Sequence, residues 1–543
     1  MSAQTPRSET ATIAGNVQQF ASSDLHSLQE KKDSVTGDDP EYATGLGLAT
    51  IMSTILACTL LAALDIRGFQ TTAIPRITDD FRQLDQVGWY GSACFLLVGT
   101  SAPMWGKLYK YFSGRLVYIG SLSLFLVGSI IAAAAPNSAA FIVARAIQGW
   151  GCSGTLSGSI LMIVYVAAPA KRPMLIGVWM GVFMIFTIVG PVIGGAFTSE
   201  VTWRWCFWIN LPVGGPVLVL LFLFFHVPKH ITPVQATWKE ILLQLDLPGF
   251  SLLLGSLVSF TLALQWGGQS KPWNDGSVIA TLVMFGVLTV AFVITEWLQG
   301  AYAMVPLSLL KPRIAWTNAL YAYISNLADF QVLFYLPIYF LSIHGQSAIT
   351  SGVNSLPFMA TFAAGAMLSG ALVGKTRFLQ PYELLSAVLA TAGAAISYTL
   401  DLDSSKARYV GAPILIPMTA LQGFSNAEDV PSTTGIILMC NSISGAYFVT
   451  AAQSLFANRM LKSLAASELS IDAATVLATG ASELQRVFGG DELAAVLGAY
   501  MTGMKGVFAF SLAGTAFTVL LALLIPFKRL PAYDHVDKQT EKE

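Results

Sequence analysis

Long apolar segments recur along the 543-residue chain, and they constrain its fold more than any other feature. A helix that crosses a bilayer needs about 20 largely apolar residues, because its backbone polar groups must be satisfied within the helix. Fourteen segments fit, at 46–66, 89–106, 116–135, 139–166, 174–197, 205–226, 247–265, 277–298, 315–338, 351–373, 382–400, 409–425, 433–456 and 507–527. The segment at 409–425 is short and contains two glycines and two prolines. The chain is therefore expected to be an all-α polytopic membrane protein.

The composition supports lipid as the solvent for much of the surface. Hydrophobic residues make up 54% of the chain and charged residues 11%, whereas a soluble domain carries about 25% charged residues. The net charge of −1 argues against a nucleic-acid partner. The five cysteines lie in or beside apolar runs and are expected to be buried hydrophobes rather than disulfides.

Basic residues in the connections predict the orientation. Cytoplasmic loops of membrane proteins are enriched in lysine and arginine, and alternate loops follow this pattern if the N-terminus is cytoplasmic. An even number of spans then places the C-terminus in the cytoplasm as well. Residues 1–45 are rich in Ser, Thr, Gln and acids, which predicts a disordered cytoplasmic tail. The segment at 457–506 is expected to be an amphipathic outer loop with a short interfacial helix at 491–497.

A weak internal repeat predicts two halves. Pro75 precedes Gly106 by 31 residues and Pro337 precedes Gly370 by 33, with basic residues after each glycine. Parallel repeats of this kind build many transporters, although chance recurrence is the alternative. The expected organisation is a tail at 1–45, a six-helix half at 46–226, a loop and two inserted helices at 227–298, a second six-helix half at 299–530, and a tail at 531–543.

Two motifs carry charge at the membrane. Gly106 opens a basic loop that includes Leu108 and Lys110, and such a loop either stabilises one conformation of a transporter or only sets topology. In the fourth span, Arg145 and Gln148 share one helix face. An arginine inside a span costs about 2.5–3.5 kcal/mol on insertion scales, so Arg145 should face the interior and pair there. It is interpreted as a proton-coupling or substrate-orienting residue, or else as a structural arginine bonded to backbone carbonyls.

Two further stretches concern helix packing and the membrane boundary. Gly190, Pro191, Gly194 and Gly195 form a Gly-Pro-x-x-Gly-Gly motif in the fifth span. Glycines four residues apart allow close helix approach, and proline bends a helix, so the motif is expected to control opening and leak. The aromatic stretch 203–212 beside a short outer loop is expected to anchor the protein at the interface.

These four stretches, in this order, resemble the major facilitator superfamily, and in particular its fourteen-helix drug:H⁺ antiporter branch of the fungal toxin-efflux type. The segments 87–92, 135–138, 264–268 and 335–339 add to the resemblance, which covers roughly residues 45–530. It implies alternating access, proton antiport and broad apolar substrates. By position, Arg145 matches the arginine tied to proton transfer, Gly190 to Gly195 match the antiporter motif, and Gly106 and Leu108 match the inner-loop motif.

The sequence departs from that family at three places. Lys110 replaces the usual acid of the inner-loop motif, and the region between residues 409 and 431 is several residues short. The acid of the first helix, Asp65, lies one residue earlier than the family pattern. One residue turns a side chain by about 100° on an α-helix, so the shift leaves open whether Asp65 faces the cavity. Together with Arg145 and Gln148, Asp65 is taken as a candidate proton-coupling or substrate residue. Asp329 is an additional acid in the ninth span, expected to bind a proton or a cationic substrate, or to lie near the interface as Glu296 is expected to do.

The predicted function is proton-coupled efflux of hydrophobic small molecules, such as a fungal metabolite, toxin or drug. The alternative is an importer or a vacuolar carrier of amino acids or iron chelates on the same fold. No histidine, cysteine or carboxylate cluster suggests an enzyme or a metal site, and no nucleotide-binding loop suggests ATP coupling. We expect no cofactor and a monomer in the plasma membrane, with the vacuolar membrane as the alternative.

Overall fold

The computed structural model describes residues 45–65, 77, 80–81, 87–168, 171–224, 233–346, 348–402, 404, 430–467, 471–472, 475–476, 479, 483–527 and 529. Helices occupy every predicted span except 409–425, which lies outside these residues. They are α2 (Gly45–Ala63), α4 (Val87–Tyr111), α5 (Gly114–Ala133), α6 (Ser138–Val166), α7 (Arg172–Glu200), α8 (Trp205–Trp208), α9 (Asn210–Phe224), α10 (Trp238–Gln244), α11 (Leu247–Trp266), α12 (Gly276–Gln299), η4 (Gly300–Tyr302), α13 (Leu307–Leu310), α14 (Arg313–Ser342), α15 (Ala348–Thr376), α16 (Gln380–Tyr398), α18 (Val430–Ala465), α20 (Leu484–Val487) and α21 (Gly490–Leu524).

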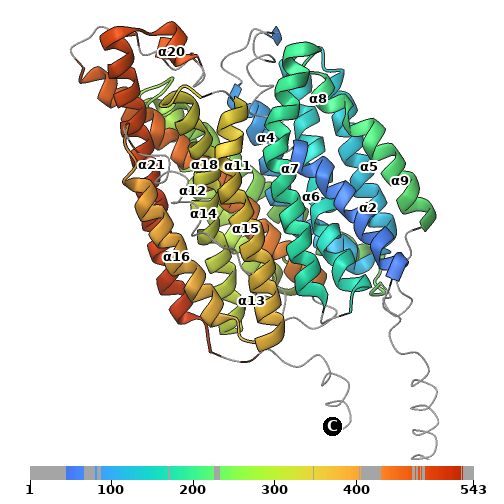
Figure 1. Cartoon of the computed structure of the whole chain (residues 1–543). Helices are drawn as coiled ribbons and strands as arrows, with labels where there is room; N and C mark the ends of the chain where they lie inside the picture. Colours follow the sequence, from blue (N-terminus) through green and yellow to red (C-terminus); the bar gives the residue numbers. More distant parts are fainter. Residues whose placement is uncertain are drawn as a thin grey trace, which may run out of the picture.

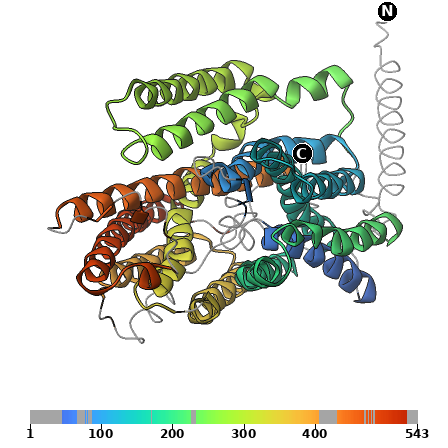
Figure 2. The ribbon, with the colours of Figure 1, turned by 90° about the horizontal axis from the view of Figure 1, so that it is seen from above.

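The helices form two groups that stand side by side (Figure 1). The first group comprises α2 and α4 to α9, and the last group comprises α14 to α16, α18 and α21. The two groups meet mainly along two helix pairs, α4 with α18 and α7 with α15. The inserted pair α11–α12 lies along one side, where α11 contacts both α4 and α18 (Figure 2).

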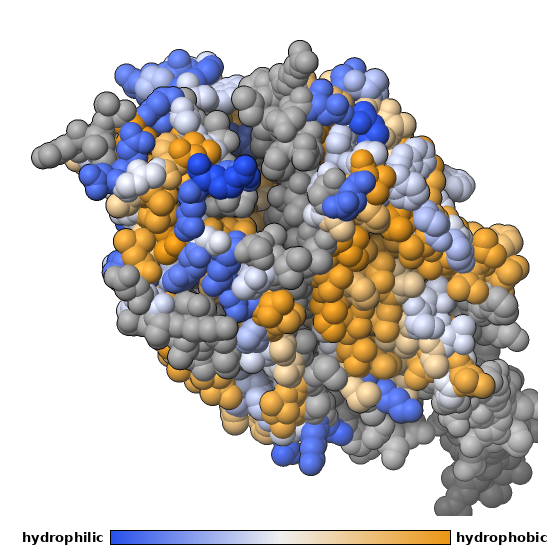
Figure 3. Space-filling model, turned by 45° about the horizontal axis from the view of Figure 1, so that its top comes forward, coloured by the Kyte–Doolittle hydropathy of each residue, from blue (hydrophilic) through white to orange (hydrophobic). Residues whose placement is uncertain are grey.

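The two ends of the bundle carry polar residues, and an apolar surface lies between them (Figure 3). Nine of the described helices or helix pairs are long and apolar enough to cross a membrane. The inserted helix α12 is the clearest case, because only 6% of its most apolar stretch is buried. Such a helix is stable only with lipid around it. We name the two ends of the bundle by a residue at each, the Lys107 end and the Trp203 end.

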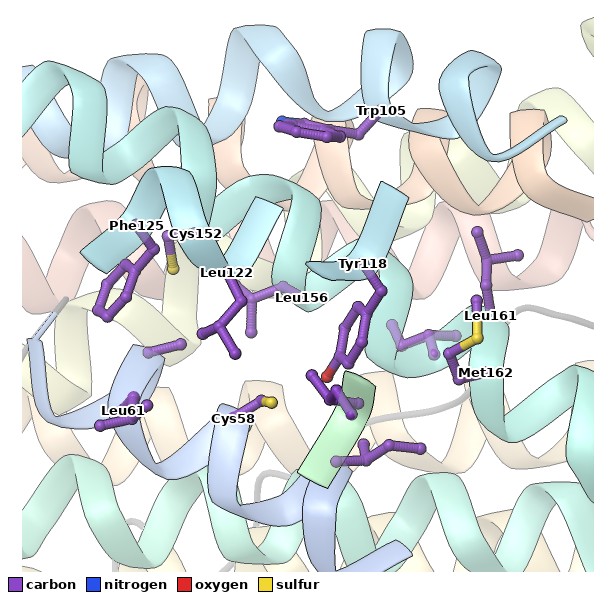
Figure 4. Packing of buried hydrophobic residues seen from close by; sticks show 14 of the residues in the cluster. Cys58, Leu61, Trp105, Tyr118, Leu122, Phe125, Cys152, Leu156, Leu161 and Met162 are labelled. Atoms are coloured by element: carbon purple, nitrogen blue, oxygen red, sulfur yellow. The ribbon is translucent and has the colours of Figure 1, made fainter. Parts of the chain in front are cut away.

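The first group packs through small residues on α6. The side chains of α2, α4, α5 and α6 interdigitate in a buried cluster that includes Cys58, Leu122 and Cys152 (Figure 4). Helix–helix association in lipid depends on close van der Waals contact, which small residues permit. At Gly151, an added Cβ would lie 2.8 Å from the carbonyl oxygen of Ser121 on α5. The helices α5 and α6 therefore touch backbone to backbone.

One predicted boundary was wrong, and one predicted span is interrupted. The residues expected to form a separate interfacial helix, 491–497, are the first turns of α21, a continuous helix of 35 residues. Acidic residues in that first turn, Asp491 and Glu492, favour a helix start because they complement the helix dipole. The sixth span is divided between α8 and α9, which meet at Ile209. Four cysteines are buried and Cys440 is half-buried, all of them free, as expected.

The close contact of α5 and α6 gives a test of this packing. We expect Gly151→Val to destabilise the protein by about 1–3 kcal/mol, because the new side chain would overlap α5. Gly120→Val on α5 is the matched control, since nothing lies within 4 Å of a Cβ there. The measurement is the Tm of each purified variant in mild detergent. Equal Tm values for the two variants would contradict the backbone contact.

Candidate functional site

A buried arginine lies at the centre of the candidate site. Helix α6 begins at the Trp203 end, where the side chain of Asn137 caps it by accepting a hydrogen bond from the Ala140 amide (2.8 Å). Arg145 follows about two turns later and only 1% of its surface is exposed. A charge within a spanning helix is costly unless it is paired inside the protein. The prediction that Arg145 faces the interior is thus consistent with the structure.

Three groups accept hydrogen bonds from the guanidinium. Its Nη1 donates to the Asp65 carboxylate at 2.6 Å and to the Gln148 amide oxygen at 2.6 Å. Its Nε donates to the backbone carbonyl of Tyr90 at 3.2 Å. These partners come from α2, α6 and α4, so the arginine joins three helices. The predicted residues Arg145, Gln148 and Asp65 are brought together at one place.

The contact of Asp65 answers a question that the sequence leaves open. On the assumption of α-helical geometry, the one-residue shift left open whether this acid faces the interior. Helix α2 instead continues as a π-helical turn through Leu64 and Asp65. A π-helical turn contains more residues than an α-helical turn, so the angle assumed for one residue does not apply. The Asp65 side chain is fully buried and forms the ion pair.

The polar network extends from Arg145 to two other helices. The Gln148 amide donates to the Ser129 hydroxyl on α5 at 2.7 Å, and the Asn210 amide on α9 donates to the same hydroxyl at 3.0 Å. Ser129 and Asn210 are fully buried. Sequence reasoning missed both residues. Asn210 stood in the aromatic stretch, and its amide in an otherwise apolar context was the signal that could have found it.

Aromatic side chains cover the ion pair. The Arg145 guanidinium lies 5.6 Å from the centre of the Phe207 ring, a cation–π distance. Phe141 packs edge-to-face on Tyr90, Trp203 and Phe207. The aromatic stretch was predicted to anchor the membrane boundary, which was wrong for Trp203 and Phe207, since both are buried. These rings pack around the guanidinium, which is only 1% exposed.

The ion pair retains unused hydrogen-bonding capacity. Among the described residues, Oδ1 of Asp65 and Nη2 of Arg145 have no hydrogen-bond partner. Buried polar atoms are nearly always hydrogen-bonded. The carboxylate oxygen Oδ1 is thus an atom of the pair that a proton can bind.

A second ion pair lies at the surface of the Trp203 end. Arg204 donates to the Asp80 carboxylate at 2.9 Å, and the Trp203 indole donates to the same oxygen at 3.1 Å. These hydrogen bonds, chiefly that from Arg204, hold the pKa of Asp80 below its usual value. Both charged side chains of this pair are at least one-third exposed. Such a pair contributes little to stability.

The remaining predicted residues lie elsewhere. The last turns of α4, at the Lys107 end, contain Gly106, Leu108 and Lys110. Gly106 lies against Gly435 of α18, where a Cβ added to Gly435 would lie 3.4 Å from the Cα of Gly106. In α7, Gly190 and Gly194 are buried and Gly195 is half-buried, while the side chain of Pro191 lies outside the described residues.

Two predicted acids lie outside the site, and only Glu296 differs from its expectation. Asp329 is half-buried near the middle of α14 in the last group, and thus not at a helix end. Glu296 was expected at the interface, but only 5% of its surface is exposed. Its carboxylate accepts a hydrogen bond from the Val305 amide at 2.8 Å.

Comparison with known proteins gives consistent results. A sequence model of the Major Facilitator Superfamily matches residues 55–449. Efflux pump notK of Aspergillus sp. (strain MF297-2) is 71% identical over 514 residues, covering 93% of this chain and 91% of the relative. The dehydrocurvularin exporter of Alternaria cinerariae is 61% identical over 530 residues, covering 95% of this chain and 91% of that protein.

A solved structure shares the fold. A bacterial homologue of the human lysosomal transporter Spinster, in an inward-facing and unoccupied conformation, superposes with a TM-score of 0.55 at 14% identity. The match covers 89% of this chain and 98% of that chain. At this identity the likeness concerns the fold alone.

The buried ion pair gives a prediction of stability. Arg145→Met should destabilise the protein by about 3–5 kcal/mol, because it leaves the Asp65 carboxylate uncompensated in an apolar interior. Adding Asp65→Asn should restore part of that loss, since both charges are then absent. The measurement is a double-mutant cycle on the Tm in detergent. Additive effects of the two substitutions would contradict a direct pair.

Proposed function

The chain belongs to the major facilitator superfamily of membrane transporters, and on this premise we propose that it exports a hydrophobic small organic molecule in exchange for protons. It is a multi-pass membrane transporter and not an enzyme. Relatives at 71% and 61% identity are named as an efflux pump and an exporter, which supports outward transport. The substrate we propose is a fungal secondary metabolite or an apolar toxin.

The buried Asp65–Arg145 pair is the observation that supports proton coupling. An arginine side chain stays protonated in proteins, so Asp65 is the member of the pair that can take up a proton. Protonation removes its charge and most of the attraction between the two groups. Arg145 then lacks a compensating charge in an apolar interior, a costly state. The first group can lower this cost by moving Arg145 toward another partner.

We propose that this movement of Arg145, after protonation of Asp65, drives alternating access. We assign Gln148 to hold the guanidinium through its amide oxygen, 2.6 Å away, while the carboxylate changes its charge. The glycines of α4 and α7 lie on the two helices through which the groups meet. Closure at the Lys107 end is assigned to three residues of α4, Gly106, Leu108 and Lys110. The close packing of α7 is assigned to Gly190, Pro191, Gly194 and Gly195.

Asp329 receives a separate role in this proposal. It lies in the last group near the middle of α14 and is half-buried, whereas Asp65 is fully buried in the first group. A carboxylate at this depth suits either a second proton or a cationic part of the substrate. Asp329→Asn should then reduce export of cationic substrates more than export of neutral ones.

We propose the plasma membrane as the location, with both termini in the cytoplasm, and a monomer as the working unit. The Lys107 end then faces the cytoplasm. Fluorescence of a C-terminal tag would separate the plasma membrane from the vacuolar membrane. Vacuolar fluorescence would favour the alternative of a vacuolar carrier.

Export of a fluorescent hydrophobic drug from cells that express the chain tests the function. We expect export to stop when a protonophore is added, because the proton gradient supplies the energy. Export that persists with the protonophore would contradict proton coupling. No export at good surface expression would instead favour an importer or a carrier with a narrow substrate range.

Substitutions in the ion pair test which residues couple export to protons. Arg145→Ala should lower the export rate about tenfold or more, since a loss of about 1.4 kcal/mol already corresponds to tenfold. Asp65→Asn should remove the dependence of the remaining export on external pH. Arg204→Ala is the matched control, because it removes an arginine of the exposed pair near the same end. If Arg204→Ala and Arg145→Ala had equal effects at equal surface expression, the assignment would be wrong.

A further inference from the structure

Three buried charges meet at the Lys107 end, outside the Asp65–Arg145 site. Lys107 on α4 is 3% exposed, Asp246 before α11 is 1% exposed, and Glu296 near the end of α12 is 5% exposed. Burial of a charge costs several kcal/mol unless hydrogen bonds and opposite charges compensate it. The contacts of these side chains therefore indicate what the cluster holds in place.

Lys107 binds the chain that follows α12. Its ammonium group has three N–H donors. They bond the Gln244 amide oxygen at 2.9 Å, the Tyr302 carbonyl at 3.0 Å and the Ala303 carbonyl. All three donors are used, and two of the acceptors are backbone atoms of the connection between α12 and α13. The end of α4 is thus tied to this connection.

Asp246 joins three segments through one carboxylate. Its Oδ1 accepts from the Gly249 amide at the start of α11 (2.8 Å) and from the Gln299 side chain at the end of α12 (2.7 Å). Its Oδ2 accepts from the Met304 amide at 2.8 Å. Asp246 has a φ of 46°, a left-handed conformation that aspartate adopts more readily than most residues. The three hydrogen bonds to its carboxylate hold Asp246 in this conformation.

Glu296 completes the cluster by binding the next residue of the connection. Its Oε2 accepts from the Val305 amide at 2.8 Å. The charge of Lys107 attracts both carboxylates, while Asp246 and Glu296 repel each other. The lysine therefore offsets the repulsion between the two acids. Loss of the lysine charge would leave two like charges buried side by side, whereas loss of either acid would remove one of the two counter-charges of the lysine.

The segment held by the cluster lies at the contact between the two helix groups. Met304 and Val305 pack with Ala102 of α4 and with Ile436 of α18 in one apolar cluster. The inserted helix α11 contributes to the same cluster and contacts both α4 and α18. The segment 302–305 thus forms part of the surface on which α18 meets α4.

We propose that Lys107, Asp246 and Glu296 form a latch that fixes the segment 302–305 on α4, so that α18 closes against a rigid surface at the Lys107 end. The three are positioning residues for transport, and they contact no substrate. Weakening the latch frees Met304 and Val305 and disfavours the closed arrangement of α4 and α18. The inference rests on the proposed function only in requiring that the two groups move apart during transport.

Spin-label distance measurements on the full-length chain test the latch without any substrate. Labels on Ser113→Cys of the first group and Lys375→Cys of the last group are exposed at the Lys107 end. We expect Asp246→Asn or Glu296→Gln to raise the ratio of long to short distances about tenfold, because each weakens a hydrogen bond to a buried charge. Both substitutions preserve side-chain shape, and if one variant does not fold, the other decides.

Asp275→Asn is the matched control. Asp275 also caps a helix of the inserted pair, accepting a hydrogen bond from the Ser277 amide at 2.8 Å, but it contacts none of the latch residues. Its distance distribution should equal that of the parent protein. If Asp246→Asn and Glu296→Gln lower the Tm but leave the distances unchanged, the cluster is a structural anchor and the latch is refuted. A shift in distance in a protein that exports nothing would support the latch while refuting the proposed function.

Discussion

The pairing of Arg145 with Asp65 is the interaction on which the first group depends. A lipid environment offers no water to a buried guanidinium, so the protein itself must supply every partner. Asp65, at the π-helical turn, and the amide oxygen of Gln148 meet this requirement. Aromatic rings also lie around the pair, including Phe207 at 5.6 Å. One charge thereby fixes the relative positions of several helices.

Helix α4 connects the ion pair with the contact between the helix groups. Near its start, the Tyr90 carbonyl accepts a hydrogen bond from Arg145. Farther along, Ala102 and Gly106 meet α18, and at its end Lys107 binds the connection after α12. A small displacement of α4 therefore affects all three places. Such a helix can carry a change at the ion pair to the opposite end of the bundle, because packed helices move as rigid elements.

The sequence predicts the helices well because hydrophobic runs determine them directly. It also predicts that Arg145 faces the interior, since the cost of a charge in lipid is large. The direction of Asp65 could not be derived from the sequence, because a local π-helical turn changes the angle per residue. The burial of Glu296 was missed because its partner, the Val305 amide, follows a change of chain direction. Contacts of this kind arise from tertiary packing, which hydrophobic periodicity does not contain.

The contacts of Lys107 have a consequence for biosynthesis. Every residue that the lysine, Asp246 and Glu296 bind precedes residue 306, so these bonds can form while the remainder of the chain is still on the ribosome. The order of synthesis places the first group and the inserted pair in the bilayer before α14 emerges. The nascent last group then meets a surface that is already assembled along α4 and α11. Each helix of the last group can then pack, as it is inserted, against helices that have already folded.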